Sequence, residues 1–345
     1  MSACGGAYGG SCTPTVTVTN APATVMGTVT LTANATAQGS YTVTSVQFQV
    51  DGKAVGAAVT TAPYSYAWVS TTVANGVHQI TALVTDSINQ TMTSAAVSLT
   101  VKNGPMAVSL AADQVFPVPA TAATGIGSFA VNGAGGALSG SVTLNGVTPT
   151  GVEMGDAFAG AQSAAVFTLV RNSGNTNQWD LPAGISLDAQ QLKDLAAGKL
   201  YVLVRSALNP NGELRAQVLP AGIVVKVARL AGSAETPAVS STTMGQVAVT
   251  VDAARLRAVA NINVVGLTAT GAELATGGAG TMGTHLATLA VDASNPNHYF
   301  DEAIALTSAD AANFTNGLWY GNVFSVAHAA GEMRGQLADP APTMP

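Results

Sequence analysis

Two matching segments of the chain combine an aromatic ring with the side chains that bind hydroxyl groups. Asn177-Gln178-Trp179-Asp180 is followed, 120 positions later, by Asn297-His298-Tyr299. A flat ring can stack on a sugar while amide and carboxylate groups hydrogen-bond its hydroxyls. The simpler interpretation is that each ring closes the end of a strand. The candidate ligand contacts are Asn177, Trp179, Asp180, Asn297 and Tyr299.

After each of these two segments, an acidic residue and a basic residue lie two positions apart. Glu213 precedes Arg215, and Glu332 precedes Arg334. Side chains two apart in a strand project from one face, so each couple predicts an ion pair. Charged residues make up only 9% of the chain, which favours a structural pair that fixes a hairpin over capture of a charged ligand.

Catalytic or metal chemistry has little support in the residues. Glu153 and Asp156 could act as acid and base or hold a calcium ion, but the second copy keeps only Glu273 and no nucleophile accompanies the carboxylates. His285, His298 and His328 show no i, i+2 pairing, which favours surface or loop histidines over a metal site. The chain also lacks a glycine-rich phosphate loop and a Ser-His-Asp order. We therefore predict no enzyme activity, no metal and no cofactor, with a degenerate metal-binding, enzyme-like domain as a remote alternative.

These residues lie in a tandem repeat that occupies the last two thirds of the chain. Gly212-Glu213-Leu214-Arg215-Ala216-Gln217 reappears as Gly331-Glu332-Met333-Arg334-Gly335-Gln336. A period of about 120 residues indicates duplicated domains rather than a solenoid, whose periods are about 20–50 residues. Each copy predicts an entry strand, a proline-containing loop, alternating strands, one short helix and a final hairpin. The helices are expected within 186–198 and 307–317, since each segment has a capping residue, an early acid and a terminal glycine.

Composition favours an all-β protein. The 345 residues are 48% hydrophobic and rich in Gly, Ala, Thr, Val and Ser, which is typical of short strands joined by tight turns. No apolar run reaches the roughly 18 residues needed to cross a bilayer. The net charge of the chain is −6. The segment before residue 105 is neutral, the first copy carries a charge near −2, and the second copy carries a charge near −4. With no basic cluster, nucleic acid is excluded as a partner.

The region before the repeats has its own strand pattern. Val46, Phe48 and Val50 alternate with polar residues, and Asp51-Gly52 predicts a hairpin turn. The segments 46–52, 62–68 and 74–82 resemble bacterial immunoglobulin-like modules, over about 14–102. The resemblance implies a seven-stranded sandwich that serves as a spacer or display module. Trp68 is expected in its core, and His78 is expected to be structural.

Both repeats resemble the CHRD domain. The first copy carries the resemblance in Gln114-Val115-Phe116-Pro117-Val118-Pro119, in Gly198-Lys199-Leu200-Tyr201-Val202 and in Asn209-Pro210-Asn211-Gly212-Glu213-Leu214-Arg215, whereas the second lacks the Asn-Pro. The family implies an extracellular β-sandwich with a binding or structural role. Many members carry a His-x-His pair in a central strand, which could hold a transition metal. Here that position reads Val152-Glu153-Met154 or Ala272-Glu273-Leu274.

Both cysteines of the chain, Cys4 and Cys12, lie at its start. Ser2-Ala3-Cys4-Gly5 matches the end of a bacterial lipobox, with Met1 as a replacement start after trimming of the signal. Cys4 would then carry a lipid. A Cys4–Cys12 disulfide and two inert thiols stay open as alternatives.

The sequence as a whole predicts three antiparallel β-sandwich domains in tandem, one immunoglobulin-like and two CHRD-like, each of the latter with a short helix. The expected segments are a tether over 1–12, the immunoglobulin-like domain over 13–103, CHRD-like domains over 106–219 and 223–338, and a disordered tail over 339–345. The predicted function is that of a non-enzymatic extracellular or cell-surface protein with a structural or adhesive role. Few charges protect its strand edges, so self-association with a second copy of the chain is one predicted interaction. The competing interpretation is a glycan- or protein-binding surface module. The predicted location is extracellular or at the cell surface, as a lipoprotein that is held at the outer membrane only through a lipid on Cys4.

Overall fold

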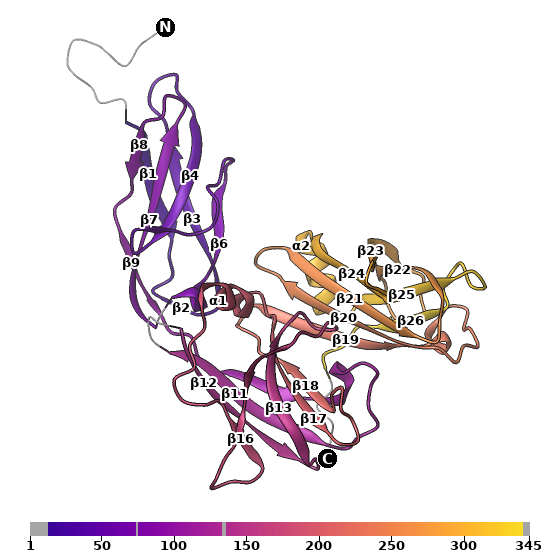
Figure 1. The fold of residues 1–345 in the computed structure, drawn as a ribbon. Helices are drawn as coiled ribbons and strands as arrows, with labels where there is room; N and C mark the ends of the chain where they lie inside the picture. The colour runs from indigo at the N-terminus through magenta and orange to yellow at the C-terminus, as the bar shows by residue number, and fades with distance from the viewer. Residues whose placement is uncertain (1–12, 74, 133–135, 341–345) are drawn as a thin grey trace, which may run out of the picture. The chain divides into compact units, whose positions relative to one another are not determined.

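The computed structural model describes residues 13–73, 75–132 and 136–340 of the chain. They divide into two compact units, one with the described residues up to 104 together with 131, 132 and 136, and one with residues 105–130 and 137–340. Strands dominate both units, as Figure 1 shows. The predicted all-β architecture is confirmed. The expected tether over 1–12 and the end of the expected tail lie outside the described residues.

The first unit is a β-sandwich. One sheet contains β1 (Thr15–Asn20), β3 (Thr28–Thr36) and β6 (Tyr64–Val69). The other contains β2 (Thr24–Val25), β9 (Val97–Val101), β7 (Gly76–Asp86), β4 (Val43–Val50) and β5 (Lys53–Ala54), with β8 (Thr91–Thr93) paired to β7. A 3-10 turn spans Ser70–Thr72. The described residues of this unit form nine strands, whereas the resemblance implied seven. Three of the nine, β2, β5 and β8, are only two or three residues long, and they account for the higher number.

Alternation along the strands builds this sandwich core. Phe48 and Trp68 are 1% and 2% exposed and pack in one apolar cluster. The predicted turn is confirmed, because Asp51 and Gly52 take φ angles of 49° and 75° between β4 and β5, as a two-residue hairpin loop requires. His78 is buried, and its Nδ1 lies 2.6 Å from Oδ2 of Asp51. The histidine therefore ties its strand to the turn, as expected for a structural role.

The first copy of the repeat also forms two sheets. One contains β10 (Met106–Leu110), β11 (Thr124–Asn132), β12 (Ala137–Asn145), β16 (Gln178–Asp180) and β15 (Val170–Arg171). The other contains β14 (Ala165–Thr168), β13 (Pro149–Asp156), β17 (Leu200–Ser206) and β18 (Leu214–Gln217). A 3-10 turn spans Ala112–Gln114.

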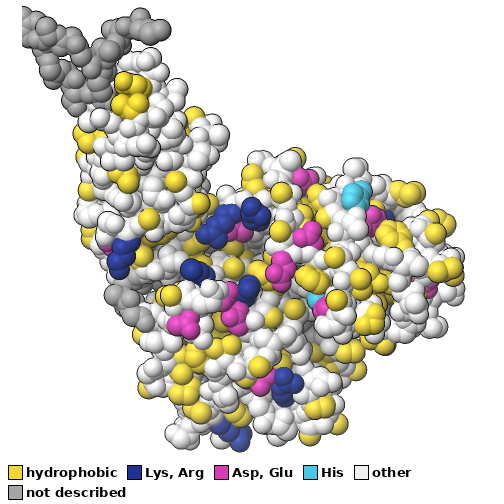
Figure 2. All heavy atoms as spheres, turned by 45° about the horizontal axis from the view of Figure 1, so that its top comes forward, with side chains coloured by type: hydrophobic (Ala, Val, Ile, Leu, Met, Phe, Trp, Pro, Cys, Tyr) yellow, Lys and Arg dark blue, Asp and Glu magenta, His cyan; other side chains and the backbone are white. Residues whose placement is uncertain are grey.

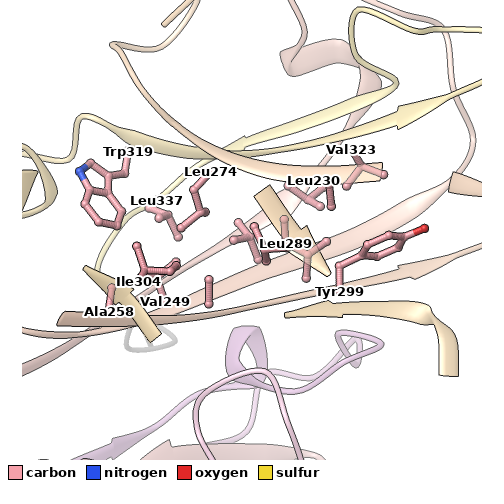
Figure 3. Packing of buried hydrophobic residues seen from close by; sticks show 14 of the residues in the cluster. Leu230, Val249, Ala258, Leu274, Leu289, Tyr299, Ile304, Trp319, Val323 and Leu337 are labelled. Atoms are coloured by element: carbon pink, nitrogen blue, oxygen red, sulfur yellow. The ribbon is translucent and has the colours of Figure 1, made fainter. Parts of the chain in front are cut away.

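The second copy repeats this strand order, and three of its strands are longer than their counterparts. Its strands are β19 (Ile223–Leu230), β20 (Met244–Asp252), β21 (Arg257–Val265), β24 (Asn295–Ala305), β23 (Thr284–Asp292), β22 (Ala269–Thr276), β25 (Trp319–Ser325) and β26 (Met333–Gln336). A 3-10 turn spans Gly232–Ala234. β23 pairs with β22 in one sheet and with β24 in the other, so a single strand replaces β14 and β15 of the first copy. Figure 3 shows the apolar side chains packed between the sheets, among them Leu274, Leu289 and Trp319.

Each copy has one short helix, α1 (Ala189–Ala196) and α2 (Ser308–Thr315). Both begin with a capping box, in which Asp188 or Thr307 accepts from the backbone of the third helical residue. Gly198 and Gly317 follow with φ angles of 79° and 71°, a conformation that glycine adopts at no steric cost. The helices therefore lie inside the predicted segments, and α1 begins three residues after the first residue of its segment. Neither these helices nor any other in the described ranges has the length and hydropathy of a membrane span.

Candidate functional site

Trp179 is the middle residue of the short strand β16, and its side chain lies on the face of the sheet that is turned to the core. Trp179 pairs with Val142 across β16 and β12, and paired residues of antiparallel strands project to the same face. Val142 is fully buried, whereas Trp179 is half-buried. Asp180 is already engaged, since Asn172 and Gln178 each donate to it at 2.6 Å. These contacts favour a structural role for Trp179 and Asp180, whereas Asn177 stays exposed.

The corresponding ring of the second copy, Tyr299, belongs to the core. It is 5% exposed, and its hydroxyl donates to the carbonyl of Ala269 at 3.1 Å. In Figure 3 the ring lies at the margin of the apolar cluster with its oxygen at the far end. The packed ring and its bonded hydroxyl favour the structural interpretation of Tyr299 over its alternative, a ligand contact.

The predicted ion pairs within the last strands are also corrected. Glu213 accepts from the hydroxyl of Thr121 at 2.7 Å, and Glu332 accepts from Ser241 and Ser325 at 2.6 and 2.8 Å. Burial raises the pKa of the Glu213 carboxyl, but bonds from the side chains of Ser206, Thr121 and Asn209 together outweigh it, so the pKa is lowered. The bonds from Ser241 and Ser325 lower the pKa of Glu332 against a smaller effect of burial. Each glutamate thus ties the final hairpin to other segments of its own copy.

The arginines serve a different structural purpose. The guanidinium of Arg215 lies 4.0 Å from the ring centre of Tyr201, and that of Arg334 lies 3.4 Å from the ring centre of Tyr320. Arg215 donates to Gln217 Oε1 at 2.7 Å and to the Phe158 carbonyl at 3.1 Å. Burial lowers the pKa of Arg215 to about 10. Ring stacking and loop carbonyls, rather than carboxylates, therefore hold both cations.

The glutamine two residues after each arginine completes this arrangement. Gln217 Nε2 donates to the carbonyls of Gly198 at 2.6 Å and Ala157 at 3.1 Å. Gln336 Nε2 donates in the same way to Gly317 at 2.7 Å and Gly277 at 3.0 Å. The sequence contained the signal for this cluster in the repeated Arg-x-Gln and in the tyrosine of each preceding strand.

The two carboxylates Glu153 and Asp156 do not form one site. They are three apart in β13, so they project to opposite faces. Arg205 donates to Glu153 Oε1 from Nε and Nη2, at 2.9 and 2.6 Å. Burial raises the pKa of Asp156, and the nearby carboxylate of Asp194 adds to this effect. Asp194 is paired in turn with Lys199 at 3.3 Å. One carboxylate is thus neutralised by an arginine, and the other belongs to a separate cluster.

Each histidine of the second copy lies beside one carboxylate. The distances from ring nitrogen to carboxylate oxygen are 2.8 Å for His285 with Glu273, 3.1 Å for His298 with Asp292, and 3.8 Å for His328 with Glu332. Across the residues that the structure describes, no three His, Cys, Asp or Glu side chains gather closely enough to hold a metal ion.

The most distinctive arrangement of polar groups joins the two copies of the repeat. Three amide side chains on β20 and β21 of the second copy donate to loop carbonyls of the first, and those of Gln246 and Asn261 are buried, whereas that of Asn263 is half-buried. Gln246 bonds Asp113 and Val115, Asn261 bonds Ala159 at 2.9 Å, and Asn263 bonds Gly160 at 2.7 Å. The equivalent positions of the first copy are Ile126, Ser141 and Thr143. Loops of the first copy therefore cover the outer face of this sheet in the second copy. An alignment of the two repeats shows amides at these three positions only in the second copy, and this difference could have indicated the junction.

A cavity of about 550 Å³ opens beside this junction. The first copy contributes Gln114, Phe116, Gly160, Ala161, Gln162 and Arg215 to its lining, and the second contributes Gln246, Asn263, Val264, Val265, Asp292, Ser294, Asn295, Asn297 and His298. We call it the junction cavity. Of the predicted ligand contacts, Asn297 lines it, whereas Asn177, Trp179 and Asp180 lie elsewhere. It has the size of an ordinary small-molecule site.

The acidic side of the junction cavity is preorganised. Asp292 accepts from the backbone and hydroxyl of Ser294 at 2.8 and 2.7 Å. These bonds and that to His298 lower the pKa of Asp292 to about 2. The other ring nitrogen of His298, Nε2, lies 2.9 Å from Oδ1 of Asn261. The histidine therefore connects the cavity to the amide that holds the two copies together.

The fold and the junction define a class of tandem β-sandwich modules. Comparison with known families gives the same result. The model of the CHRD domain matches residues 106–218 and 227–337, and that of the bacterial Ig domain matches residues 14–82. The chain belongs to the CHRD domain family. The domain types found in it are non-catalytic modules.

Other comparisons add little to this assignment. No curated protein matches the chain. A solved structure of fibronectin(III)-like modules of Clostridium thermocellum CbhA is 27% identical over 27% of this chain, with a TM-score of 0.24. The match covers 48% of that solved chain, about half of its length.

Proposed function

We propose that the chain is a non-enzymatic structural and adhesive protein of the bacterial cell surface. Its domain types support this assignment, because bacterial Ig and CHRD domains fit an extracellular protein. The two CHRD copies act as one body that presents a fixed surface, and the immunoglobulin-like domain acts as a spacer.

The direct docking of the two copies carries the proposal. Three amides cross the junction, and two of them, Gln246 and Asn261, are buried. Each bond of these two that is not made would leave a buried polar group without a partner, at a cost of about 1–3 kcal/mol. Such a junction resists bending better than a flexible linker does. A fixed relative position is what a structural module needs and what an isolated binding domain does not require.

Self-association is part of the proposal and has its own support. β14 lies at the edge of its sheet and contains only uncharged residues, Ala165 to Thr168. Charged side chains commonly protect exposed strand edges from pairing with other chains. Figure 2 shows how sparse charged side chains are on the face that it presents. An unprotected edge supports assembly through strand pairing.

Light scattering coupled to size exclusion, with electron micrographs of the same fractions, tests this assembly. The wild-type chain should form ordered oligomers or filaments, and Val166→Lys on the β14 edge should reduce them. Val97→Lys at the start of β9 in the immunoglobulin-like domain, a position that is also half-buried, controls for added charge. A monomer at every concentration would exclude self-assembly and leave adhesion to a different partner.

Anchoring through a lipid on Cys4 completes the proposal. The residue lies outside the described part of the chain, and its support is the lipobox-like Ser2-Ala3-Cys4-Gly5. Expression in a bacterium, with the chain fused to a complete lipoprotein signal, should send the protein to the detergent phase of a Triton X-114 separation. Cys4→Ser should move it to the aqueous phase, whereas Cys12→Ser should not. Equal behaviour of the two variants would contradict an anchor at Cys4.

A further inference from the structure

We propose that the junction cavity binds a neutral oligosaccharide. The site is independent of self-association and of any lipid anchor, since it depends only on the docking of the two copies. It lies away from Trp179, where the sequence pattern placed a sugar site. The argument rests on the chemistry of the lining, on its charge and on its shape.

Amide side chains dominate the polar lining of the cavity. Gln114, Gln162, Gln246, Asn263, Asn295 and Asn297 all contribute to it. An amide offers both a donor and an acceptor, and a sugar hydroxyl does the same. A lining of amides therefore matches a ligand that carries many hydroxyl groups.

Much of this hydrogen-bonding capacity is unused by the protein. The amide of Asn297 is exposed and makes no side-chain bond to the described residues, and Asn263 uses its nitrogen but not its oxygen. Gln162 makes one long bond, from Nε2 to the Asn211 carbonyl at 3.4 Å. Buried Gln246 Oε1, which is shielded from solvent, also has no partner in the described structure. Free donors and acceptors thus coexist around one space, as binding of hydroxyls requires.

An apolar surface accompanies the amides. The half-buried ring of Phe116 lines the cavity on the side of the first copy, and Val264 and Val265 line it on the side of the second. The aliphatic face of a pyranose ring packs on such side chains, above all on an aromatic ring. The cavity volume of about 550 Å³ accommodates more than one sugar ring.

The charges in the lining disfavour an anion or a metal ion. The only guanidinium, that of Arg215, is turned to the ring of Tyr201 and to the carbonyls of residues 157 and 158. The only carboxylate, that of Asp292, already accepts from Ser294. The Arg215 cation is thus engaged elsewhere, and the ionised carboxylate of Asp292 repels an anion. Among the described residues no three His, Cys, Asp or Glu side chains could hold a metal ion, so a neutral ligand is favoured.

Titration calorimetry of the full chain with three neutral tetrasaccharides, cellotetraose, chitotetraose and maltotetraose, tests the proposal. Tetragalacturonate serves as the charged comparator. We expect at least one neutral sugar to bind with a dissociation constant at or below about 1 mM, and tetragalacturonate to bind more weakly. Asn297→Ala should weaken binding about tenfold, since it removes one or two hydrogen bonds from an exposed position.

The repeat supplies a matched control for this substitution. Asn177 occupies the same place in the first copy and is also exposed, so Asn177→Ala should leave the affinity unchanged. Gln162→Ala, at a second exposed position of the lining, should weaken binding as Asn297→Ala does. The proposal is overturned if none of the neutral sugars binds, if tetragalacturonate binds most tightly, or if Asn177→Ala lowers the affinity as much as Asn297→Ala.

Discussion

Replacement of Asn261 by alanine should loosen the junction between the two CHRD copies. The Asn261 side chain is 4% exposed and makes two bonds of 2.9 Å, from Nδ2 to the Ala159 carbonyl and from Oδ1 to the His298 ring. Ala159 itself is 4% exposed, so water cannot easily replace the lost donor. The substitution therefore leaves one buried carbonyl without a partner and one histidine without its acceptor.

The cost follows from these two losses. An unsatisfied buried carbonyl costs about 1–3 kcal/mol, and loss of the bond to His298 adds about 0.5–1.5 kcal/mol. We expect the free energy of unfolding to fall by about 2–4 kcal/mol in total. Asn261→Asp should cost more, because it replaces the donor with a carboxylate that faces the Ala159 carbonyl.

Urea denaturation followed by circular dichroism measures this effect. With a denaturant dependence of about 3 kcal/mol per molar, the loss shifts the midpoint of the affected transition by about 1 M. Ser141→Ala is the matched control, because Ser141 occupies the same strand position in the first copy. Its side chain makes no bond across the junction, so the control should cost less than about 0.5 kcal/mol.

The result that refutes this reasoning is a loss for Asn261→Ala no larger than that for Ser141→Ala. The amide would then contribute no more than an ordinary strand side chain, and the junction would not depend on the bond to Ala159. The structural function proposed above would lose its main support.

Three further outcomes are expected. The pKa of Asp292 is lowered from 3.8 to about 2, so its ionised form stabilises the fold above about pH 4. This contribution to the free energy of unfolding disappears as the pH falls toward 2. Asp292→Asn should therefore reduce the loss of thermal stability that the protein shows between pH 4 and pH 2. Gly321→Ala should cost about 1–3 kcal/mol in urea, because the new Cβ would lie 2.9 Å from the Cβ of buried Val247. Trp179→Ala should lower the free energy of unfolding without changing the sugar affinity in the calorimetric titration. A loss of sugar affinity in this variant would place the sugar site at Trp179 instead of the junction cavity.

Much of the fold could be predicted because its signals are local or periodic. Alternation placed Phe48 in a buried strand, Asp51-Gly52 set a hairpin turn, and glycine after each helix ended it. The repeat then extended each interpretation from one copy to the other. Such features depend on residues that are neighbours in the chain, so the sequence contains the information needed to recognise them.

The candidate site could be predicted only in part. The charge alternation around Arg215 suggested an ion pair with Glu213, but its partners are Tyr201 and carbonyls near residue 158, which are distant in the chain. Tyr299 matched a sugar-binding pattern and is a core residue. An i, i+2 spacing fixes which face a side chain occupies, but it does not fix which groups from other strands meet that face.

The amino-acid sequence by itself determined the all-β class, the duplication, the position of each helix and the family resemblance, because periodicity, turn residues and repeated landmarks act over short distances. Tertiary structure alone decided that Gln246, Asn261 and Asn263 reach the loops of the first copy, and that Asn297 rather than Trp179 lines a cavity. The two halves of that cavity come from separate parts of the chain, within residues 114–215 and 246–298. Only packing of one copy against the other brings their free amides around the same space.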